Sequence, residues 1–368
     1  MKKKNILIFA PMIGGGGVEK NLFIIANYLS EHFKNVSIVS TSKEFKSKFN
    51  KNIRFISPKS KLWNRIKNRR MKILVCLYLL AKELFFNKGW KVLSFQGNLY
   101  CCLLCNVFKT KVILRSNASI TGWSKGYFKK ILYNTISKMA DKIIVNSLEF
   151  QKEYIKHFNL KTKFIYNPLN RDEIIKNSKK KINFSFFKKQ TFNFVNIGRL
   201  VSQKNQLLIL KSFKLLSEKT SYKFKLLMIG SGEDRKILLD FIKKNNLNSS
   251  IKMIKFRENP FPYLRKSNAF ILASIFEGLP NVLLEALTLK KLVISSDCPT
   301  GPKEILDHGK GGLTFKMNNE FDLYEKIIFF IKNKSRCQKL AEHGFNRLTR
   351  FDYHKNLKEY LKIINSLD

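Results

Sequence analysis

Short apolar runs alternate with longer segments of helical periodicity along the whole chain. Five of these runs lie in the first half, at 5–10, 36–40, 92–95, 112–114 and 142–145. Five more lie in the second half, at 192–197, 224–229, 251–256, 269–273 and 292–296. Runs that are short and mostly apolar are typical of parallel strands buried on both faces, with helices as their connections. The pattern therefore predicts parallel sheets covered by helices.

A polar stretch without periodicity separates the two series. It covers residues 176–189 (KNSKKKINFSFFKK) and follows a turn at Asn167–Asn170. The pattern therefore predicts an α/β fold of two doubly wound domains in tandem. The predicted parts are a first domain, a linker, a second domain and a C-terminal helix that could cross back to the first domain, at 1–170, 171–191, 192–350 and 351–368.

The charge of the chain is unusual for a protein of 368 residues. The chain contains 70 Lys and Arg but only 26 Asp and Glu, which gives a net charge of +44. Because 44% of the residues are apolar, general disorder is excluded. A surplus of this size indicates an anionic partner: nucleic acid, an anionic bilayer or a phosphorylated substrate. Compositional drift explains it equally well, because the chain is also rich in Asn, Ile and Phe.

The basic residues are densest between Lys59 and Lys72, where seven of them occur without an acid. An amphipathic helical pattern, Ile73–Phe86, follows directly. A basic run that leads into an apolar face is typical of a helix lying on an anionic membrane surface. An ordinary helix packed on a sheet fits the pattern as well. No apolar stretch reaches the ~20 residues that a membrane-spanning helix needs.

The cysteines do not form a disulfide pattern. No His or second Cys pair stands at zinc-ligand spacing near Cys101, Cys102 and Cys105, so we expect these three to be core residues. Nothing at the N-terminus resembles a signal peptide. The sequence thus predicts a cytoplasmic protein, located at the inner face of the cytoplasmic membrane if the 59–86 segment binds lipid.

A glycine-rich turn follows the first predicted strand. Residues Gly14–Gly17 precede a helix that begins near Glu19. Glycines allow a ligand to approach the backbone, and a helix N-terminus attracts anions. The turn matches neither the dinucleotide fingerprint nor the P-loop, so a flexible turn and a phosphate or sugar cradle both remain open.

The second series of strands begins with a run that ends in Gly198, Arg199 and, five residues further, Lys204. Open α/β sheets bind ligands at the carboxyl ends of their strands. A guanidinium and an ammonium at this place would hold a diphosphate.

A second group of candidates follows the run at 269–273, in the segment 276–287 (FEGLPNVLLEAL). Glu277 is expected in the loop before a helix and Glu285 inside that helix. Glu285 lies on an otherwise apolar helix, where an acid needs a hydrogen-bond partner. A ligand hydroxyl would provide one, and so would a structural donor.

These segments, with 297–305 (DCPTGPKEI) and 198–205 (GRLVSQKN), resemble the retaining glycosyltransferases of family 4. The resemblance implies the GT-B fold, two facing Rossmann-like domains with a deep interdomain cleft. The N-terminal Rossmann-like domain would then bind the acceptor, and the C-terminal one would bind the nucleotide-sugar donor. The resemblance covers nearly the whole chain and is more specific in the second half. It implies that Arg199 and Lys204 hold the donor diphosphate, that Glu277 contacts the transferred sugar, and that Glu285 binds the ribose.

The resemblance also implies which other residues line the nucleotide-sugar site. Those of the second half are Gly198, Gly230, Ser231, Gly232, Arg257, Gly278, Leu279, Asn281 and Val282. From the first half, Gly15, Gly16 and Gly17 are expected to face the diphosphate, with Glu19 on the acceptor side.

One motif departs from the family pattern. Where many relatives carry a His after the strand at 112–114, this chain reads Arg115-Ser116-Asn117. Asn117 is the candidate in its place, on the acceptor side. The chain contains no Asp-x-Asp motif, so we expect no metal and no cofactor.

The resemblance predicts an enzyme that moves a sugar, with retained configuration, from a nucleotide diphosphate sugar such as a UDP-sugar to a hydroxyl of a glycan, polyprenol-linked or lipopolysaccharide-type acceptor in cell-envelope polysaccharide biosynthesis. An epimerase of the same fold is an alternative. A nucleic-acid-binding protein is a second, suggested by charge alone; since no binding module is recognisable, we expect no nucleic acid partner.

Overall fold

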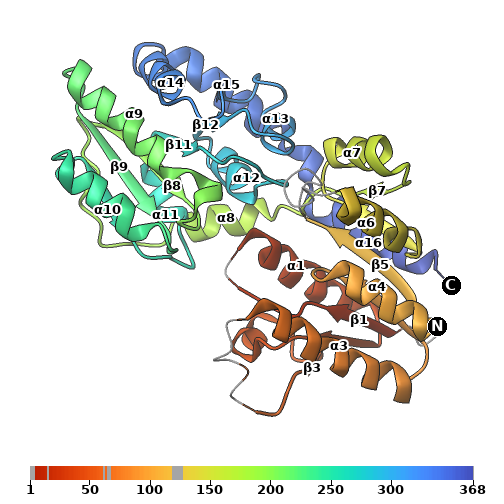
Figure 1. The fold of residues 1–368 in the computed structure, drawn as a ribbon. Coiled ribbons are helices and arrows are strands. Elements are labelled where there is room, and N and C mark those ends of the chain that lie inside the picture. Colours follow the sequence, from red (N-terminus) through yellow and green to blue (C-terminus); the bar gives the residue numbers. More distant parts are fainter. Residues whose placement is uncertain (1–4, 15, 61–62, 64–67, 118–126, 368) are drawn as a thin grey trace. The chain divides into compact units, whose positions relative to one another are not determined.

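The computed structural model describes residues 5–14, 16–60, 63, 68–117 and 127–367. The chain divides into two compact units. Unit 1 contains residues 1–168 and 353–368, and unit 2 contains residues 169–352. The C-terminal helix therefore belongs to the same unit as the N-terminus (Figure 1).

Unit 1 contains a seven-stranded parallel sheet in the order β3-β2-β1-β4-β5-β6-β7. Its strands are β1 (Asn5–Phe9), β2 (Asn35–Val39), β3 (Arg54–Ile56), β4 (Trp90–Ser94), β5 (Lys111–Ser116), β6 (Lys142–Val145) and β7 (Lys163–Phe164). The order changes direction between β1 and β4, which is the arrangement of a Rossmann-like sheet. The predicted parallel sheet is confirmed.

Helices cover both faces of this sheet. The helices of one face are α1 (Gly17–His32) and α16 (Tyr353–Asn365). Those of the other face are α3 (Arg69–Phe86), α4 (Asn98–Val107), α6 (Tyr127–Lys138) and α7 (Leu148–Phe158). Cys101, Cys102 and Cys105 of α4 are fully buried in the second core, so their prediction as core residues is confirmed.

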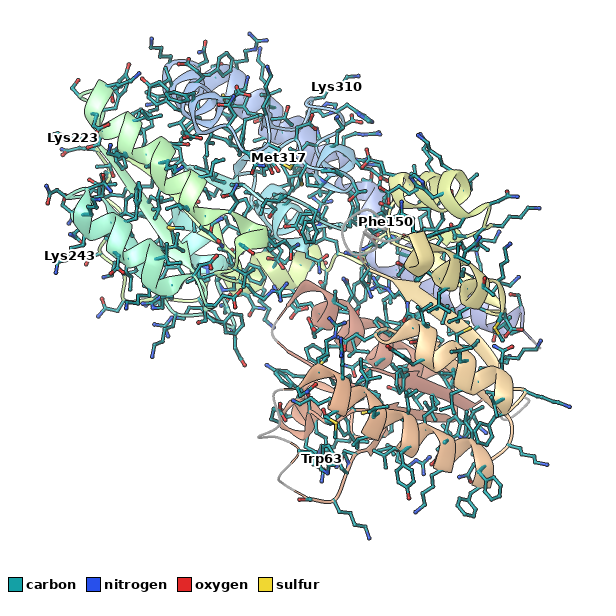
Figure 2. The ribbon with its side chains drawn as sticks, in the orientation of Figure 1. Trp63, Phe150, Lys223, Lys243, Lys310 and Met317 are labelled. Carbon is teal, nitrogen blue, oxygen red and sulfur yellow. The ribbon has the colours of Figure 1, made fainter. Side chains whose placement is uncertain are left out.

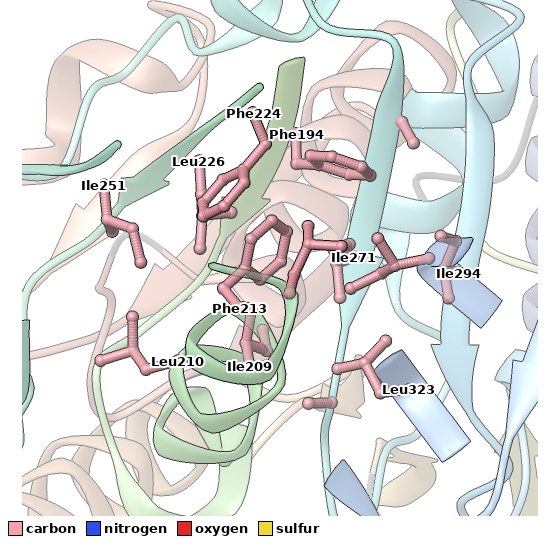
Figure 3. Close-up of a cluster of buried hydrophobic side chains, with 14 of the residues drawn as sticks. Phe194, Ile209, Leu210, Phe213, Phe224, Leu226, Ile251, Ile271, Ile294 and Leu323 are labelled. Carbon is pink, nitrogen blue, oxygen red and sulfur yellow. The ribbon is translucent and has the colours of Figure 1, made fainter. Parts of the chain in front are cut away.

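Unit 2 contains a six-stranded parallel sheet in the order β10-β9-β8-β11-β12-β13. Its strands are β8 (Phe192–Ile197), β9 (Phe224–Ile229), β10 (Ile251–Ile254), β11 (Ala269–Leu272), β12 (Leu292–Ser296) and β13 (Leu313–Phe315). Alternate strand residues such as Phe194 and Ile271 pack on Phe213 and Leu323 from the covering helices (Figure 3). This core fixes the strand ends that carry the candidate residues.

The helices of unit 2 are α8 (Arg171–Ser178), α9 (Gln206–Lys219), α10 (Arg235–Lys244), α11 (Phe261–Lys266), α12 (Asn281–Thr288), α13 (Pro302–Ile305), α14 (Glu320–Lys332) and α15 (Lys334–Asn346). Helix α8 lies in the segment expected to be a linker. It packs on α11 and α12, where Ile174 is buried, so this part of the segment belongs to unit 2.

Three short 3₁₀ turns, η1 (Lys43–Lys48), η2 (Ser202–Lys204) and η3 (Arg347–Phe351), complete the described secondary structure. Among the residues that the structure describes, no helix is both long and apolar enough to cross a membrane.

Candidate functional site

The loops that follow β8 and β9 are held together through their backbones. Leu200 donates its N–H to the carbonyl of Ser231 at 3.0 Å, and the carbonyl of Leu200 accepts from Asp234 N–H. A Cβ on Gly230 would lie 1.9 Å from the carbonyl oxygen of Gly198. Because no side chain fits there, glycine is required for the two loops to approach each other at the edge of the sheet.

Lys204 and Glu277 form an ion pair at this edge. Lys204 ends the 3₁₀ turn η2 after β8, and Glu277 lies in the loop between β11 and α12. Their side chains are 15% and 8% exposed, so both charges are largely removed from water. The Oγ of Ser274 donates a further hydrogen bond of 2.6 Å to the same carboxylate oxygen. The pair is therefore held in one geometry before any ligand binds.

The loop after β12 packs on the backbone of Glu277 and Gly278. Thr300 donates its hydroxyl to the backbone carbonyl of Glu277, and a Cβ on Gly301 would lie 1.8 Å from the carbonyl oxygen of Gly278. Burial raises the pKa of the Cys298 thiol to about 12, with a smaller contribution from Glu277. Cys298 is thus a neutral thiol beside the ion pair, not a nucleophile.

Arg199 differs from Lys204 in being exposed, and it forms no ion pair with any residue that the structure describes. Its backbone is fixed, because the Gln206 side chain donates to the Arg199 carbonyl at 2.7 Å. The guanidinium thus stands at the carboxyl end of β8, the place that parallel sheets use for anionic ligands. The structure places Arg199 and Lys204 on one loop, with only Lys204 paired.

Helix α12 begins after Pro280, and no side chain caps its N-terminus. Its first residues, Asn281 and Val282, are half-buried, and Leu279 before them is buried. The start of a helix carries a partial positive charge that favours an anion. Glu285 lies in the second turn of α12 and is buried.

The remaining candidates of unit 2 lie at the same edge of its sheet. Gly232 contacts the Leu200 backbone, where a Cβ would lie 2.1 Å from the carbonyl oxygen. The Oγ of Ser231 accepts the Phe256 N–H at 3.3 Å, which joins the loop after β9 to the loop after β10. Arg257 follows in that second loop and is exposed. The predicted second-half residues therefore all follow the carboxyl ends of β8, β9, β10 and β11.

In unit 1, the glycine turn lies at the start of α1. Gly15 lies outside the described residues. Gly16 precedes Gly17, the first residue of α1, and a Cβ on Gly16 would lie 2.7 Å from the Glu19 carboxylate. Gln96, which follows β4, donates to Glu19 at 3.4 Å and accepts from Met12 N–H. These contacts place Glu19 over the turn, at the carboxyl edge of the unit 1 sheet.

Asn117 follows β5, and its amide donates to the backbone carbonyl of Phe95 at 3.1 Å. Its neighbour Arg115 is fully buried and donates to the Tyr360 hydroxyl of α16 and to Asn167, both at 2.8 Å. Asn117 therefore ties two loops of the sheet edge together, and Arg115 anchors the C-terminal helix.

Sequence reasoning did not identify the residues that hold the ion pair. Ser274 and Thr300 carry hydroxyl groups, which are too common in loops to be informative alone. The sequence offered one signal, the position of Ser274 after a strand and three residues before Glu277. Within the described residues, no cluster of His, Cys, Asp and Glu has the arrangement of a metal site.

The comparisons with known proteins agree on one family. The family model described as glycosyl transferases group 1 matches residues 177–347. An uncharacterised glycosyltransferase of Methanocaldococcus jannaschii is 35% identical over 304 residues, which cover 71% of this chain and 74% of that protein.

A relative with a described acceptor comes from Campylobacter jejuni. It is named as a diphospho-undecaprenol 4-alpha-N-acetylgalactosaminyltransferase, and it is 26% identical over 99% of this chain and its own full length. Among solved structures, Anabaena HepE in complex with UDP has a TM-score of 0.79 at 15% identity, covering 98% of this chain and all of that one. At this identity the structural likeness establishes the fold alone.

Proposed function

This chain belongs to the group 1 glycosyltransferases, and we propose that it transfers a sugar from a UDP-sugar to a hydroxyl of a polyprenol diphosphate-linked glycan, with retention of the anomeric configuration as in family 4. The observation that carries the proposal is the buried Lys204–Glu277 ion pair beside the exposed Arg199. The Lys204 ammonium, held in place by Glu277, and the Arg199 guanidinium are the positive charges that a departing diphosphate would meet.

The donor site proposed here lies entirely in unit 2. Arg199 and Lys204 hold the diphosphate, and the N-terminus of α12 at Asn281 and Val282 contacts its oxygens. Glu277 contacts the transferred sugar and Glu285 the ribose. A UDP donor is supported by the GT-B relatives that were crystallised with UDP.

The chemistry proposed for this site is electrostatic. As the bond between the sugar and the diphosphate breaks, negative charge develops on the leaving oxygen, and cations already fixed in place stabilise it without reorganisation. The leaving oxygen accepts the proton of the acceptor hydroxyl on the same face of the sugar, so no dedicated base is needed. We propose transfer without a metal ion, because Arg199, Lys204 and α12 provide the positive charge that a metal would otherwise supply.

The acceptor is assigned to unit 1 and to the lipid-linked class. The Campylobacter relative is named for a diphospho-undecaprenol acceptor and aligns with nearly the whole of this chain. Glu19 and Asn117, at the carboxyl edge of the unit 1 sheet, are the residues proposed to face it. The expected contact between residues 59–86 and an anionic membrane belongs to this proposal; residues 61–62 and 64–67 of that segment lie outside the described residues.

A donor screen followed by product analysis tests the proposal. A nucleotide sugar that binds the folded chain raises its melting temperature, which identifies the donor. The chain is then incubated with that donor and undecaprenol diphosphate-linked GalNAc, and the configuration of the product is read by NMR. We expect an α-linked product from an α-linked donor. An isomerised nucleotide sugar formed without acceptor would instead indicate an epimerase, and an inverted linkage would contradict retention.

A further inference from the structure

Helix α3 is apolar on two opposite sides. Ile73, Cys76, Leu80 and Leu84 face the core of unit 1 and are buried. Met71, Leu74, Tyr78 and Phe85, spaced three, four and seven residues apart, form a second stripe that is exposed, with Phe85 at 68%. A helix that is apolar on two opposite sides is normally buried on both, so the outer stripe needs a covering that the residues described by the structure do not provide.

The next helix repeats the arrangement. The cysteines of α4 face the core, while Tyr100, Leu103 and Val107 form an exposed stripe at spacings of three and four, with Val107 at 76%. Helix α6 adds Ile131 and Leu132, both exposed. Neighbouring contacts join α3 to α4 and α4 to α6 on the same side of the sheet (Figure 1). The three stripes therefore belong to one face of unit 1.

The charged residues of these three helices are almost all basic. Together α3, α4 and α6 carry seven basic residues and a single acid, Glu83. Glu83 is buried and paired with Arg54, so it does not contribute to the outer surface. The basic residues whose side chains are described are Arg69, Arg70, Lys72, Lys82, Lys130 and Lys138. A partner for this face must offer apolar contact and negative charge together.

The end of the face is also basic. A hollow of about 490 Å³ opens where α3 and α4 end, and it is lined by Phe85, Trp90 and Phe108 together with Lys88, Lys91, Lys109 and Lys111. Lys88 and Lys109 are exposed, while Lys111 is paired with Asp141. Aromatic rings with lysines beside them are typical of the boundary between the acyl chains and the headgroups of a bilayer.

We propose that the outer face of α3, α4 and α6 docks unit 1 on an anionic phospholipid surface, with the apolar stripes at the acyl boundary and the basic side chains at the phosphates. This proposal adds a membrane surface to the proposed function. It rests on that function in one respect: an acceptor linked to lipid is confined to a membrane, so docking would bring the enzyme to its acceptor. It extends the contact beyond the 59–86 segment to two further helices.

Co-sedimentation of the full chain with vesicles tests this face. The vesicles are phosphatidylcholine alone and phosphatidylcholine with phosphatidylglycerol. We expect binding only to the anionic vesicles and release at high salt. The variants Tyr78→Ser with Phe85→Ser on α3, and Leu103→Ser with Val107→Ser on α4, should each weaken binding at least tenfold. All four residues are exposed, so the fold should tolerate the changes.

Matched controls come from unit 2. Ile237→Ser with Phe321→Ser removes two residues that are 58% and 57% exposed, and binding should not change. For charge, Lys82→Gln with Lys130→Gln should weaken binding by roughly a factor of five per residue. Lys223→Gln with Lys243→Gln, labelled in Figure 2, changes the net charge equally but should have little effect.

Each contrary result would contradict one specific claim. Loss of binding from the α3 pair but not the α4 pair would overturn the three-helix face, and equal binding to neutral vesicles would overturn the anionic partner. A lipid-free dimer that the α4 pair dissociates would identify a second copy as the occupant. UDP-induced stabilisation is measured on every variant. Its absence from the wild type would contradict the proposed function while leaving the membrane face untouched.

Discussion

Removing Lys204 should destabilise unit 2 even without a ligand. Lys204→Met leaves the Glu277 carboxylate 8% exposed and without its cation, while the Ser274 hydroxyl still donates to it. Breaking a buried pair in this way costs about 3–5 kcal/mol. Because the Lys204 side chain is 15% exposed, we expect the lower end, about 3 kcal/mol.

Calorimetric unfolding measures this cost. For a domain the size of unit 2, about 3 kcal/mol corresponds to a decrease in Tm of roughly 6–12 °C. Replacing both partners, in Lys204→Met with Glu277→Gln, should recover a large part of that decrease, since no unpaired charge remains. The matched control is Lys214→Met, which breaks an exposed pair with Glu218 on α9 and should cost less than about 0.5 kcal/mol. Equal shifts in Lys204→Met and Lys214→Met, or strictly additive losses in the double variant, would refute the buried pair.

Three further predictions concern the loops, the pH dependence and the metal. Gly230→Ala places a Cβ 1.9 Å from the Gly198 carbonyl and should lower Tm and abolish UDP-induced stabilisation. Gly198→Ala, whose Cβ would lie 3.9 Å from side-chain atoms, should leave Tm unchanged; similar Tm values for the two would contradict the packing. Burial, with Arg265 nearby, lowers the pKa of Lys291 to about 8 from 10.5. The unfolded chain then binds more protons between these values, so stability should rise with pH across that window, and Lys291→Met should remove the rise in urea midpoints. Chelation by EDTA should leave the transfer rate unchanged, and a rate restored only by added Mg²⁺ or Mn²⁺ would disprove metal-free transfer.

The longer strands could be predicted because they are buried on both faces and therefore read as apolar runs. Strands β3, β7 and β13 were missed. They are two or three residues long and contain Arg54, Lys163 and Thr314, so no run stands out from the flanking loops. Helix α8 was missed for a related reason, since its packing involves few apolar side chains, Ile174 among them, within a charged stretch.

The site could be predicted in its residue types but not in its contacts. Lys204 and Glu277 are 73 positions apart, and only the order of β8 beside β11 brings their loops together. The need for glycine at 230 and 301 arises from backbone carbonyls of other loops, which no local pattern reveals. Arg115 is the clearest case: a basic residue in a very basic chain is expected at the surface, yet its hydrogen bond to Tyr360 fixes it in the core of unit 1.

Calorimetric titration of UDP into the Arg199→Gln variant tests the diphosphate site most directly. Arg199 is exposed, so its replacement leaves the fold intact, and any change in affinity reports on the ligand alone. A lost hydrogen bond to a charged group, worth about 1.5–3 kcal/mol, predicts a Kd raised by roughly ten- to a hundredfold, with no change in Lys214→Gln. Equal affinity of wild type and Arg199→Gln for UDP would contradict the assignment of the donor diphosphate to the carboxyl end of β8.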